Sequence, residues 1–166
     1  MIAFRPLTAA DFPAWRDYFI DDYVREIVEN YRLTTAEAQR QAARDVELSF
    51  PDGPGTAGQQ LLHILAADGE SSQPIGYLWY KPDPIMRSVF ICDFFLFAHC
   101  RGQGFGKAAL HQLETQLAAE GYTQMMLRVA AHNTAARRVY DACGFNVTGI
   151  NMNKVLNRTG EEQRKD

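Results

Sequence analysis

The segment Arg101-Gly102-Gln103-Gly104-Phe105-Gly106-Lys107 has the residue types of an anion-binding loop. It stands between a strongly apolar run and a segment with helical periodicity, where a strand is expected to turn into a helix. Glycines at such a turn let the backbone adopt positive φ and approach a ligand closely. The free N–H groups of the first helical turn, together with the helix dipole, suit a phosphate or pyrophosphate. Arg101 and Lys107 add positive charge. A tight turn without a ligand is the alternative interpretation.

Two other phosphate-binding motifs fit this loop less well. A P-loop needs GxxxxGK followed by Ser or Thr, but Ala108 follows the lysine and Arg101 stands where the first glycine is required. Gly104, Gly106 and Ala109 satisfy the dinucleotide pattern GxGxxA. However, no Asp or Glu ends the next predicted strand, and too little chain remains for a doubly wound sheet.

A second segment with defined spacing runs from Asn133 to Phe145 and reads NTAARRVYDACGF. Asn133 is placed to cap a helix with its side chain. Ala136 and Tyr140 are four residues apart and therefore share one face of that helix. Taken alone, the segment favours a short amphipathic helix in which Tyr140 is a half-buried packing residue.

Hydrophobic periodicity predicts the elements that must position these two segments. We expect a strand at 2–5, helices that begin at capping boxes at 8–11 and 34–37, a hairpin of strands 60–67 and 74–81, a strand at 89–97, a helix at 104–120, a strand at 125–131, a helix at 133–143 and a last strand within 145–156. Strands and helices in this order indicate a mixed α/β layer structure.

Composition narrows the function classes. The 166 residues fit one domain, placed at 1–157 and followed by a charged C-terminal tail at 158–166. The net charge of −3 gives no reason to expect a nucleic-acid or membrane partner. No signal peptide is visible, and the apolar runs are too short to span a bilayer. No CxxC pair is formed by the three cysteines, Cys92, Cys100 and Cys143, so we expect neither a disulfide framework nor a metal site. The simplest setting for such a chain is the cytoplasm.

Taken together, the glycine loop and the second segment resemble the GNAT superfamily of N-acetyltransferases. The family pattern R/Q-x-x-G-x-G/A is met by Arg101, Gly104 and Gly106, and the later pattern N-x-x-A-x-x-x-Y-x-x-x-G-F is met by Asn133, Ala136, Tyr140, Gly144 and Phe145. The resemblance implies an α/β (mixed α+β) fold with a mostly antiparallel twisted central sheet and helices on both faces. It also implies that an acetyl group passes directly from acetyl-CoA to an amine of a small molecule or peptide.

The resemblance further implies which residues bind the cosubstrate. The pyrophosphate of coenzyme A is expected on the main-chain N–H groups of Arg101, Gly102, Gln103, Gly104, Phe105, Gly106 and Lys107. The pantetheine arm is expected to pair with the strand end at 95–97, because its two amides need partners when buried, and Asn133 is expected to bond that arm. A main-chain N–H near Leu96 or Phe97 is expected to polarise the thioester carbonyl, as oxyanion donors do.

Tyr140 is implied as the general acid for the departing thiolate. Asp93 is the best candidate for the general base, since a carboxylate in an otherwise apolar strand is costly unless it is paired or lies in a solvated cleft. A purely structural Asp93, and a water chain that replaces a base residue, both remain open. His99 and His132 are weaker candidates, expected at the surface and in a structural role respectively.

The acceptor site is expected at the N-terminal helices, within 12–50, and the loop 81–88. One helix carries an acidic cluster of Asp21, Asp22, Glu26 and Glu29, with Arg25 and Arg32 among them. This cluster either attracts a cationic amine or is a solvated helix face, and we favour the second. A non-catalytic acyl-CoA-binding regulatory module is the alternative function, against which Tyr140 and the intact loop argue. The resemblance leaves a homodimer open.

Overall fold

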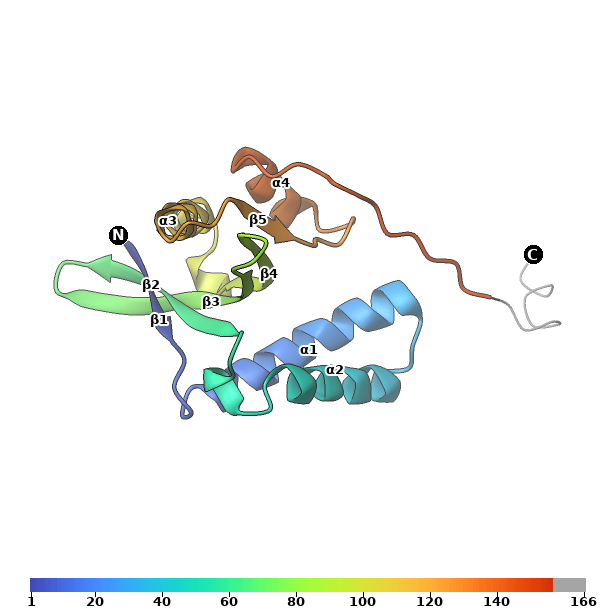
Figure 1. The fold of residues 1–166 in the computed structure, drawn as a ribbon. Coiled ribbons are helices and arrows are strands. Elements are labelled where there is room, and N and C mark those ends of the chain that lie inside the picture. Colours follow the sequence, from blue (N-terminus) through green and yellow to red (C-terminus); the bar gives the residue numbers. More distant parts are fainter. Residues whose placement is uncertain (157–166) are drawn as a thin grey trace.

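The computed structural model describes residues 1–156, and its strands form one sheet (Figure 1). The strands of this part of the chain are β1 (Ile2–Pro6), β2 (Gln60–Asp68), β3 (Ser71–Asp83), β4 (Ser88–Leu96) and β5 (Gln124–Leu127). They lie in the order β1-β2-β3-β4-β5, and only β4 and β5 run parallel. The predicted mixed, mostly antiparallel sheet is therefore confirmed.

Helices cover both faces of this sheet, as the sequence predicts. The helices are α1 (Phe12–Tyr31), α2 (Thr35–Ser49), α3 (Phe105–Ala119) and α4 (Thr134–Ala142). Figure 1 shows α1 and α2 together on one side of the sheet, with α3 and α4 on the other. Trp15 of α1 is fully buried against Trp79, and Leu110 and Leu113 of α3 are buried on the opposite face. Since each such side chain contributes about 1.5–3 kcal/mol, the sheet is held firmly between two cores.

Local signals fix where the N-terminal helices begin. The side chain of Thr34 accepts a hydrogen bond from the N–H of Glu37, whose carboxylate accepts one from the N–H of Thr34. This is the predicted capping box of α2. Thr8 and Asp11 exchange hydrogen bonds of the same reciprocal kind, but they form a turn before α1, which begins at Phe12 without a side-chain cap bond from Asp11.

Two predictions about the C-terminal part need correction. The strand expected at 125–131 ends at Leu127, because the ladder with β4 ends at the pair Ile91 and Leu127. The last strand expected within 145–156 is wrong, since this segment has no strand partner within the described residues. Its path after α4 leads away from the sheet (Figure 1), so no ladder can form there. The predicted tail at 158–166 lies outside the described residues.

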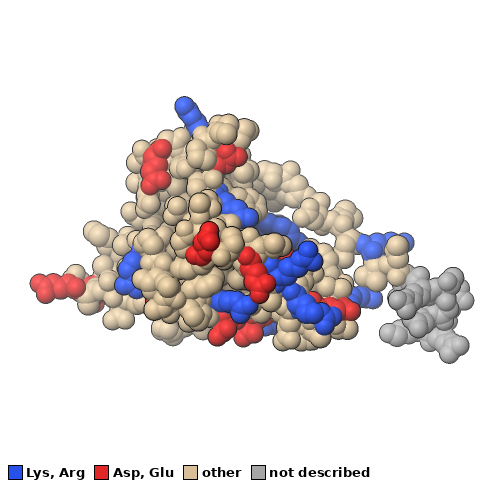
Figure 2. All heavy atoms as spheres, turned by 60° about the horizontal axis from the view of Figure 1, so that its bottom comes forward, with Lys and Arg blue, Asp and Glu red and all other residues tan. Residues whose placement is uncertain are grey.

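Charges are mixed on the surface that Figure 2 shows, where acidic and basic side chains alternate without a large patch of one sign. None of the helices in residues 1–156 is both long and apolar enough to cross a membrane. Over the same residues, no three His, Cys, Asp or Glu side chains gather as metal ligands.

Candidate active site

A β-bulge in β4 decides which way Asp93 faces. Trp79 of β3 pairs with Asp93, but the next residue, Tyr80, pairs with Ile91, so Cys92 is an extra residue in β4. Side chains alternate between the two faces of a strand. Without the bulge, Asp93 would face the α3 core as Ile91 does. The bulge turns Asp93 to the α1 face instead, which is a known use of bulges beside active sites.

On the α1 face, Asp93 meets a fixed set of aromatic side chains. The hydroxyl of Tyr18 donates to Asp93 at 3.0 Å from Oδ1 and 3.3 Å from Oδ2. The ring of Tyr18 stacks on Phe95 with centroids 4.0 Å apart and on Tyr77 at 5.5 Å. The buried indole N–H of Trp15 has no hydrogen-bond partner among the described residues, yet it lies close enough to Asp93 to favour the charged carboxylate. The carboxylate is therefore held in one place.

The pKa values at this site suit two different proton-transfer roles. Loss of solvation raises the pKa of Asp93 to about 7, the hydrogen bond from Tyr18 opposes this, and the charge of Asp22 raises it further. Burial, aided by the charge of Asp93, raises the pKa of Tyr140 to about 12. Asp93 thus exchanges its proton near neutral pH, whereas Tyr140 keeps its proton. The charge of Asp93 therefore acts on Tyr140, although no hydrogen bond joins the two side chains within the described residues.

The helix that carries Tyr140 is fixed at both ends. Asn133 caps α4, and its Oδ1 accepts a hydrogen bond from the N–H of Ala136 at 3.2 Å, as the sequence predicts. At the other end, the N–H of Phe145 donates to the carbonyl of Tyr140 at 3.0 Å, and the two rings meet edge to face. Tyr140 is half-buried between these anchors.

The glycine loop leads into the N-terminus of α3. Gly102 and Gly104 have φ of 75° and 84°, a left-handed conformation that favours glycine. The first backbone bond of the helix is donated by Ala108 to the carbonyl of Gly104. Within residues 1–156, no hydrogen bond uses the backbone N–H groups of 102–107. A run of free N–H groups at a helix N-terminus is an anion site, which fits a pyrophosphate.

The side chain of Arg101 has a role that its sequence position does not reveal. Its Nε donates to the carbonyl of Leu96 at 2.9 Å, and its guanidinium lies 5.0 Å from the ring centre of Phe95. Arg101 thus braces the end of β4 instead of pointing freely at the loop. The main-chain N–H of Arg101 is also engaged, with the carbonyl of Ala98.

The two residues predicted as oxyanion donors, Leu96 and Phe97, differ in whether their backbone N–H groups are used by the sheet. The N–H of Phe97 donates to the carbonyl of Ile75 at 2.8 Å and is therefore used by the sheet. Hydrogen-bonding direction alternates along a strand, so the N–H of Leu96 points to the opposite edge of β4. Beyond Ile91 that edge is no longer paired with β5. Of the two, Leu96 is the one whose N–H remains for a ligand.

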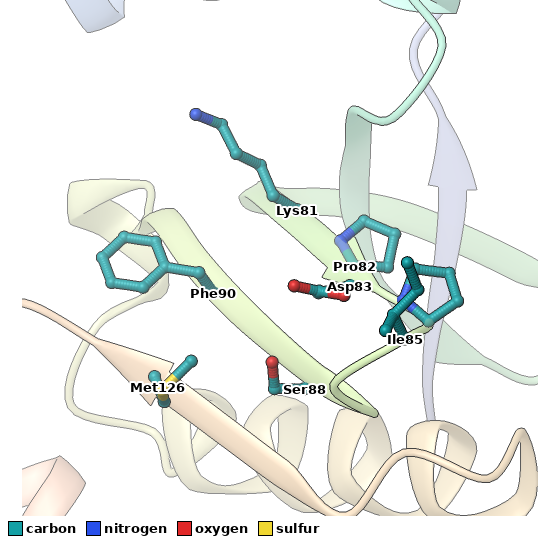
Figure 3. A pocket seen from close by; sticks show the side chains of 8 residues that line it. Lys81, Pro82, Asp83, Ile85, Ser88, Phe90 and Met126 are labelled. Carbon is teal, nitrogen blue, oxygen red and sulfur yellow. The ribbon is translucent and has the colours of Figure 1, made fainter.

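A hollow of about 400 Å³ lies on the same face of the sheet as Asp93. Lys81 and Phe90 are paired neighbours on this face, and Met126 stands beside Phe90 on β5. Figure 3 shows these three side chains around one space, which the loop after β3 closes. The lining consists of Lys81, Pro82, Asp83, Pro84, Ile85, Ser88, Phe90 and Met126. The hollow coincides with the loop 81–88 that the sequence analysis assigns to the acceptor site.

Two members of the acidic cluster on α1 are already paired. Arg128 donates to Glu26 at 3.2 Å, and Nε2 of His132 lies 3.5 Å from a carboxylate oxygen of Glu29. These contacts tie the C-terminal half of α1 to the segment after β5. His132 thus lies beside Glu29 at the surface, while His99 is exposed, as the sequence predicts, and stacks on Phe97. Within the described residues, no hydrogen bond or ion pair joins either histidine to Asp93 or Tyr140.

Sequence reasoning missed Tyr18 as the partner of Asp93. One signal was present, because Tyr18 follows the fully buried Trp15 by three residues and so lies near the buried face of the helix. The bulge at Cys92 has no sequence signal that we can identify.

Comparisons with known proteins agree with this geometry. The sequence pattern of the acetyltransferase (GNAT) family matches residues 12–145, so the chain belongs to this family. Two N-acetyltransferases of Bacillus subtilis described as uncharacterized, YdgE and YycN, are each 28% identical to it, over 90% and 93% of this chain and 95% and 99% of their own length.

Solved structures show the same fold. The crystal structure of YycN, described as a putative acetyltransferase, has a TM-score of 0.85 and covers 95% of this chain and 100% of that chain. A spermidine N-acetyltransferase from Vibrio cholerae, solved with CoA and spermine, shares the fold at 17% identity and a TM-score of 0.63, covering 89% of this chain and 82% of that chain. The protein is therefore an N-acetyltransferase that takes its acetyl group from acetyl-CoA, which confirms the resemblance.

Proposed function

We propose that Asp93 and Tyr140 carry the two proton transfers of the acetyl transfer. The observation that supports this most directly is that, beyond the effect of burial, the charge of Asp93 raises the pKa of Tyr140, although Asp93 faces α1 and Tyr140 packs against the α3 core. In the reaction a C–N bond forms between the acetyl carbon and the amine, and the C–S bond of the thioester breaks. Asp93 takes the proton that the amine must lose, and Tyr140 gives its proton to the leaving sulfur.

The ionisation of both residues fits these roles. A general base works best when its pKa lies near the working pH, and the pKa of Asp93 is about 7. A general acid must still hold its proton, and the pKa of Tyr140 is about 12. The N–H of Leu96 is proposed as the donor to the acetyl carbonyl, because such donors stabilise the charge that develops on oxygen.

The glycine loop is proposed to bind the pyrophosphate of coenzyme A through the N–H groups of 102–107. Their orientation at the N-terminus of α3 supplies both hydrogen bonds and the positive end of the helix dipole. The pantetheine arm is proposed to lie along the unpaired edge of β4 near Leu96, with the side-chain amide N–H of Asn133 as a further donor. The Oδ1 of Asn133 is already used to cap α4.

The hollow beside β4 is proposed to receive the body of the acceptor amine. Phe90 and Met126 are 40% and 38% exposed there, so they offer apolar contact to a substrate. Lys81 and Asp83 stand at the rim with opposite charges. We therefore propose a primary amine attached to a partly apolar group. Phe90→Ala is expected to raise the KM for the acceptor several-fold and to leave acetyl-CoA affinity unchanged, whereas Leu48→Ala, on the exposed face of α2, changes neither.

The rival function, a regulatory module that binds acyl-CoA without turnover, makes a different prediction. Calorimetric titration with acetyl-CoA is followed by a thiol-release assay with a panel of aliphatic, aromatic and peptide amines. We expect binding together with amine-dependent thiol release. Binding without release from any amine supports the rival and contradicts the proposal.

The proposal also covers the cellular location and the oligomeric state of the protein. We propose that the protein works in the cytoplasm, since Cys92, Cys100 and Cys143 are all free thiols in the structure. We also propose that it forms a homodimer. If the protein kept its full activity when produced in an oxidising compartment, that would argue against the cytoplasmic location. A mass of one chain in solution would contradict the homodimer.

A further inference from the structure

The side chain of Arg101 lies where two parts of the site meet, the end of β4 and the start of the glycine loop. Its Nε donates to the carbonyl of Leu96 at 2.9 Å, and its guanidinium lies 5.0 Å from the ring centre of Phe95. The guanidinium is planar and carries donors at fixed positions, whereas a lysine has a single nitrogen on a flexible stem. The hydrogen bond and the contact with the ring can therefore be made together by arginine and not by lysine.

The bond from Arg101 fixes the strand end beside the N–H of Leu96. Both polar groups of a strand residue point to the same edge, so those of Leu96 lie on the edge that β5 no longer pairs beyond Ile91. Arg101 occupies the carbonyl, and the N–H of the same peptide group, that of Phe97, donates to the carbonyl of Ile75 at 2.8 Å. This peptide group is thus held on both sides. An extended ligand on this edge meets Leu96 through its N–H.

Two stacked rings link the same guanidinium to Asp93. Phe95, which contacts Arg101, stacks on the ring of Tyr18 with centroids 4.0 Å apart. The hydroxyl of Tyr18 in turn donates to Asp93 at 3.0 Å. Burial raises the pKa of Tyr18, and the charge of Arg101 opposes this rise, so the guanidinium acts on that hydroxyl. A continuous series of contacts therefore runs from the start of the glycine loop to the bulge of β4.

We propose that Arg101 is a positioning residue that holds two groups of the acetyl transfer in place at once. It holds the N–H of Leu96 directly, and it holds the carboxylate of Asp93 through the stacked rings. The inference rests on the proposed function, in which these two groups meet the acetyl carbonyl and the amine. Because a misplacement of about 1 Å can slow a reaction about 10²-fold, loss of the Arg101 contacts should affect the rate more than binding.

Arg101→Lys tests this role, because it keeps the positive charge of the loop and removes the paired contacts. The matched control is Arg40→Lys, at an exposed position of α2. Calorimetric titration gives the Kd for acetyl-CoA, and single-turnover release of coenzyme A with saturating amine gives the rate. We expect Arg101→Lys to keep its Kd within a few-fold while its rate falls by about 10- to 100-fold. Arg40→Lys should change neither quantity.

A second measurement follows Asp93 itself and does not depend on turnover. The pH titration of its ¹³C-labelled carboxyl carbon gives the pKa of Asp93 in wild type, in each single variant Arg101→Lys and Tyr18→Phe, and in the double variant. A hydrogen bond to a charged group favours the charged form, so a loosened Tyr18 should raise the pKa of Asp93 in Arg101→Lys. In the double variant, Arg101→Lys should add no further rise, because its effect passes through the Tyr18 hydroxyl.

Three results overturn the proposal. The first is a wild-type rate in Arg101→Lys, and the second is a loss in the Kd without a loss in the rate, which would assign Arg101 to phosphate binding alone. The third is a pKa of Asp93 that Arg101→Lys leaves unchanged, or raises equally without the Tyr18 hydroxyl. Failure of the proposed function is a separate outcome: Asp93→Asn would then react at the wild-type rate, while the carboxyl titration still reports whether Arg101 acts on Asp93.

Discussion

The hydroxyl of Tyr18 and the carboxylate of Asp93 meet at 3.0 Å, although one residue lies on α1 and the other on a bulged part of β4. The contact joins the first helix of the chain to the strand on which the acetyl group is expected to lie. Burial pushes the pKa of Asp93 up, and this hydrogen bond pulls it down. Burial thus dominates the pKa of the proposed base, and a residue outside the family motifs moderates it.

Tyr18→Phe removes the donor while it keeps the ring that stacks on Phe95. A hydrogen bond to a charged group favours the charged form, so its loss raises the pKa of Asp93 above about 7. The acid limb of kcat/KM should move to higher pH, by roughly one unit if about 1.4 kcal/mol is lost. The pH profile of Tyr77→Phe, which removes a hydroxyl that does not contact Asp93, should match wild type. An unshifted pH profile in Tyr18→Phe would show that Tyr18 does not control the pKa of Asp93.

Asp93→Asn tests the same carboxylate through stability. The folded-state pKa of Asp93, about 7, lies above its ordinary value of 3.8, so the folded protein holds this proton more tightly than the unfolded chain does. Its contribution to stability is present at acid pH and is lost as the pH rises from about 4 to about 7. Asn lacks this titration. The Tm of Asp93→Asn minus that of wild type should therefore be larger at pH 8 than at pH 5, and an equal difference at both pH values would contradict the raised pKa.

The sequence was sufficient for much of the fold, because its signals are local. The capping box at Thr34, the cap at Asn133 and the glycine loop each act within a few residues, and all three form as predicted. The direction of Asp93 depends on a bulge set by pairing with β3, and residues 146–156 form no strand because no described strand pairs with them. Both are decided by contacts between distant segments, which periodicity does not encode.

Gly104→Ala tests the loop as an anion site. Gly104 has φ of 84°, and a left-handed conformation costs a residue with a Cβ about 1–2 kcal/mol. A loop that shifts to relieve this strain moves its N–H groups, so acetyl-CoA affinity should fall about tenfold, which corresponds to about 1.4 kcal/mol. Gly121→Ala, with φ of 93° at the other end of α3, should lose similar stability and keep its affinity. Calorimetric titration of both variants separates strain from binding.

Gly76→Ala tests the close contact between β3 and β4. A Cβ at this position would overlap the carbonyl oxygen of Phe95 and lie 3.0 Å from the Cα of Leu96. Overpacking of this kind costs about 1–3 kcal/mol, and here the obstacle is backbone that cannot rotate away. The midpoint of urea unfolding should fall accordingly. Gly55→Ala, which has open space around the added carbon, serves as the control, and equal midpoints for the two variants would show that the contact is not tight.

The proposed mechanism depends most on the proton of Tyr140, and Tyr140→Phe removes that proton with the smallest possible change. Single-turnover release of coenzyme A, measured together with the Kd for acetyl-CoA, separates chemistry from binding. We predict a rate lower by roughly 10²–10⁴-fold, the scale of one general acid, with the Kd unchanged. A rate within a few-fold of wild type at the same Kd would contradict this mechanism and assign the proton of the leaving thiol to another donor.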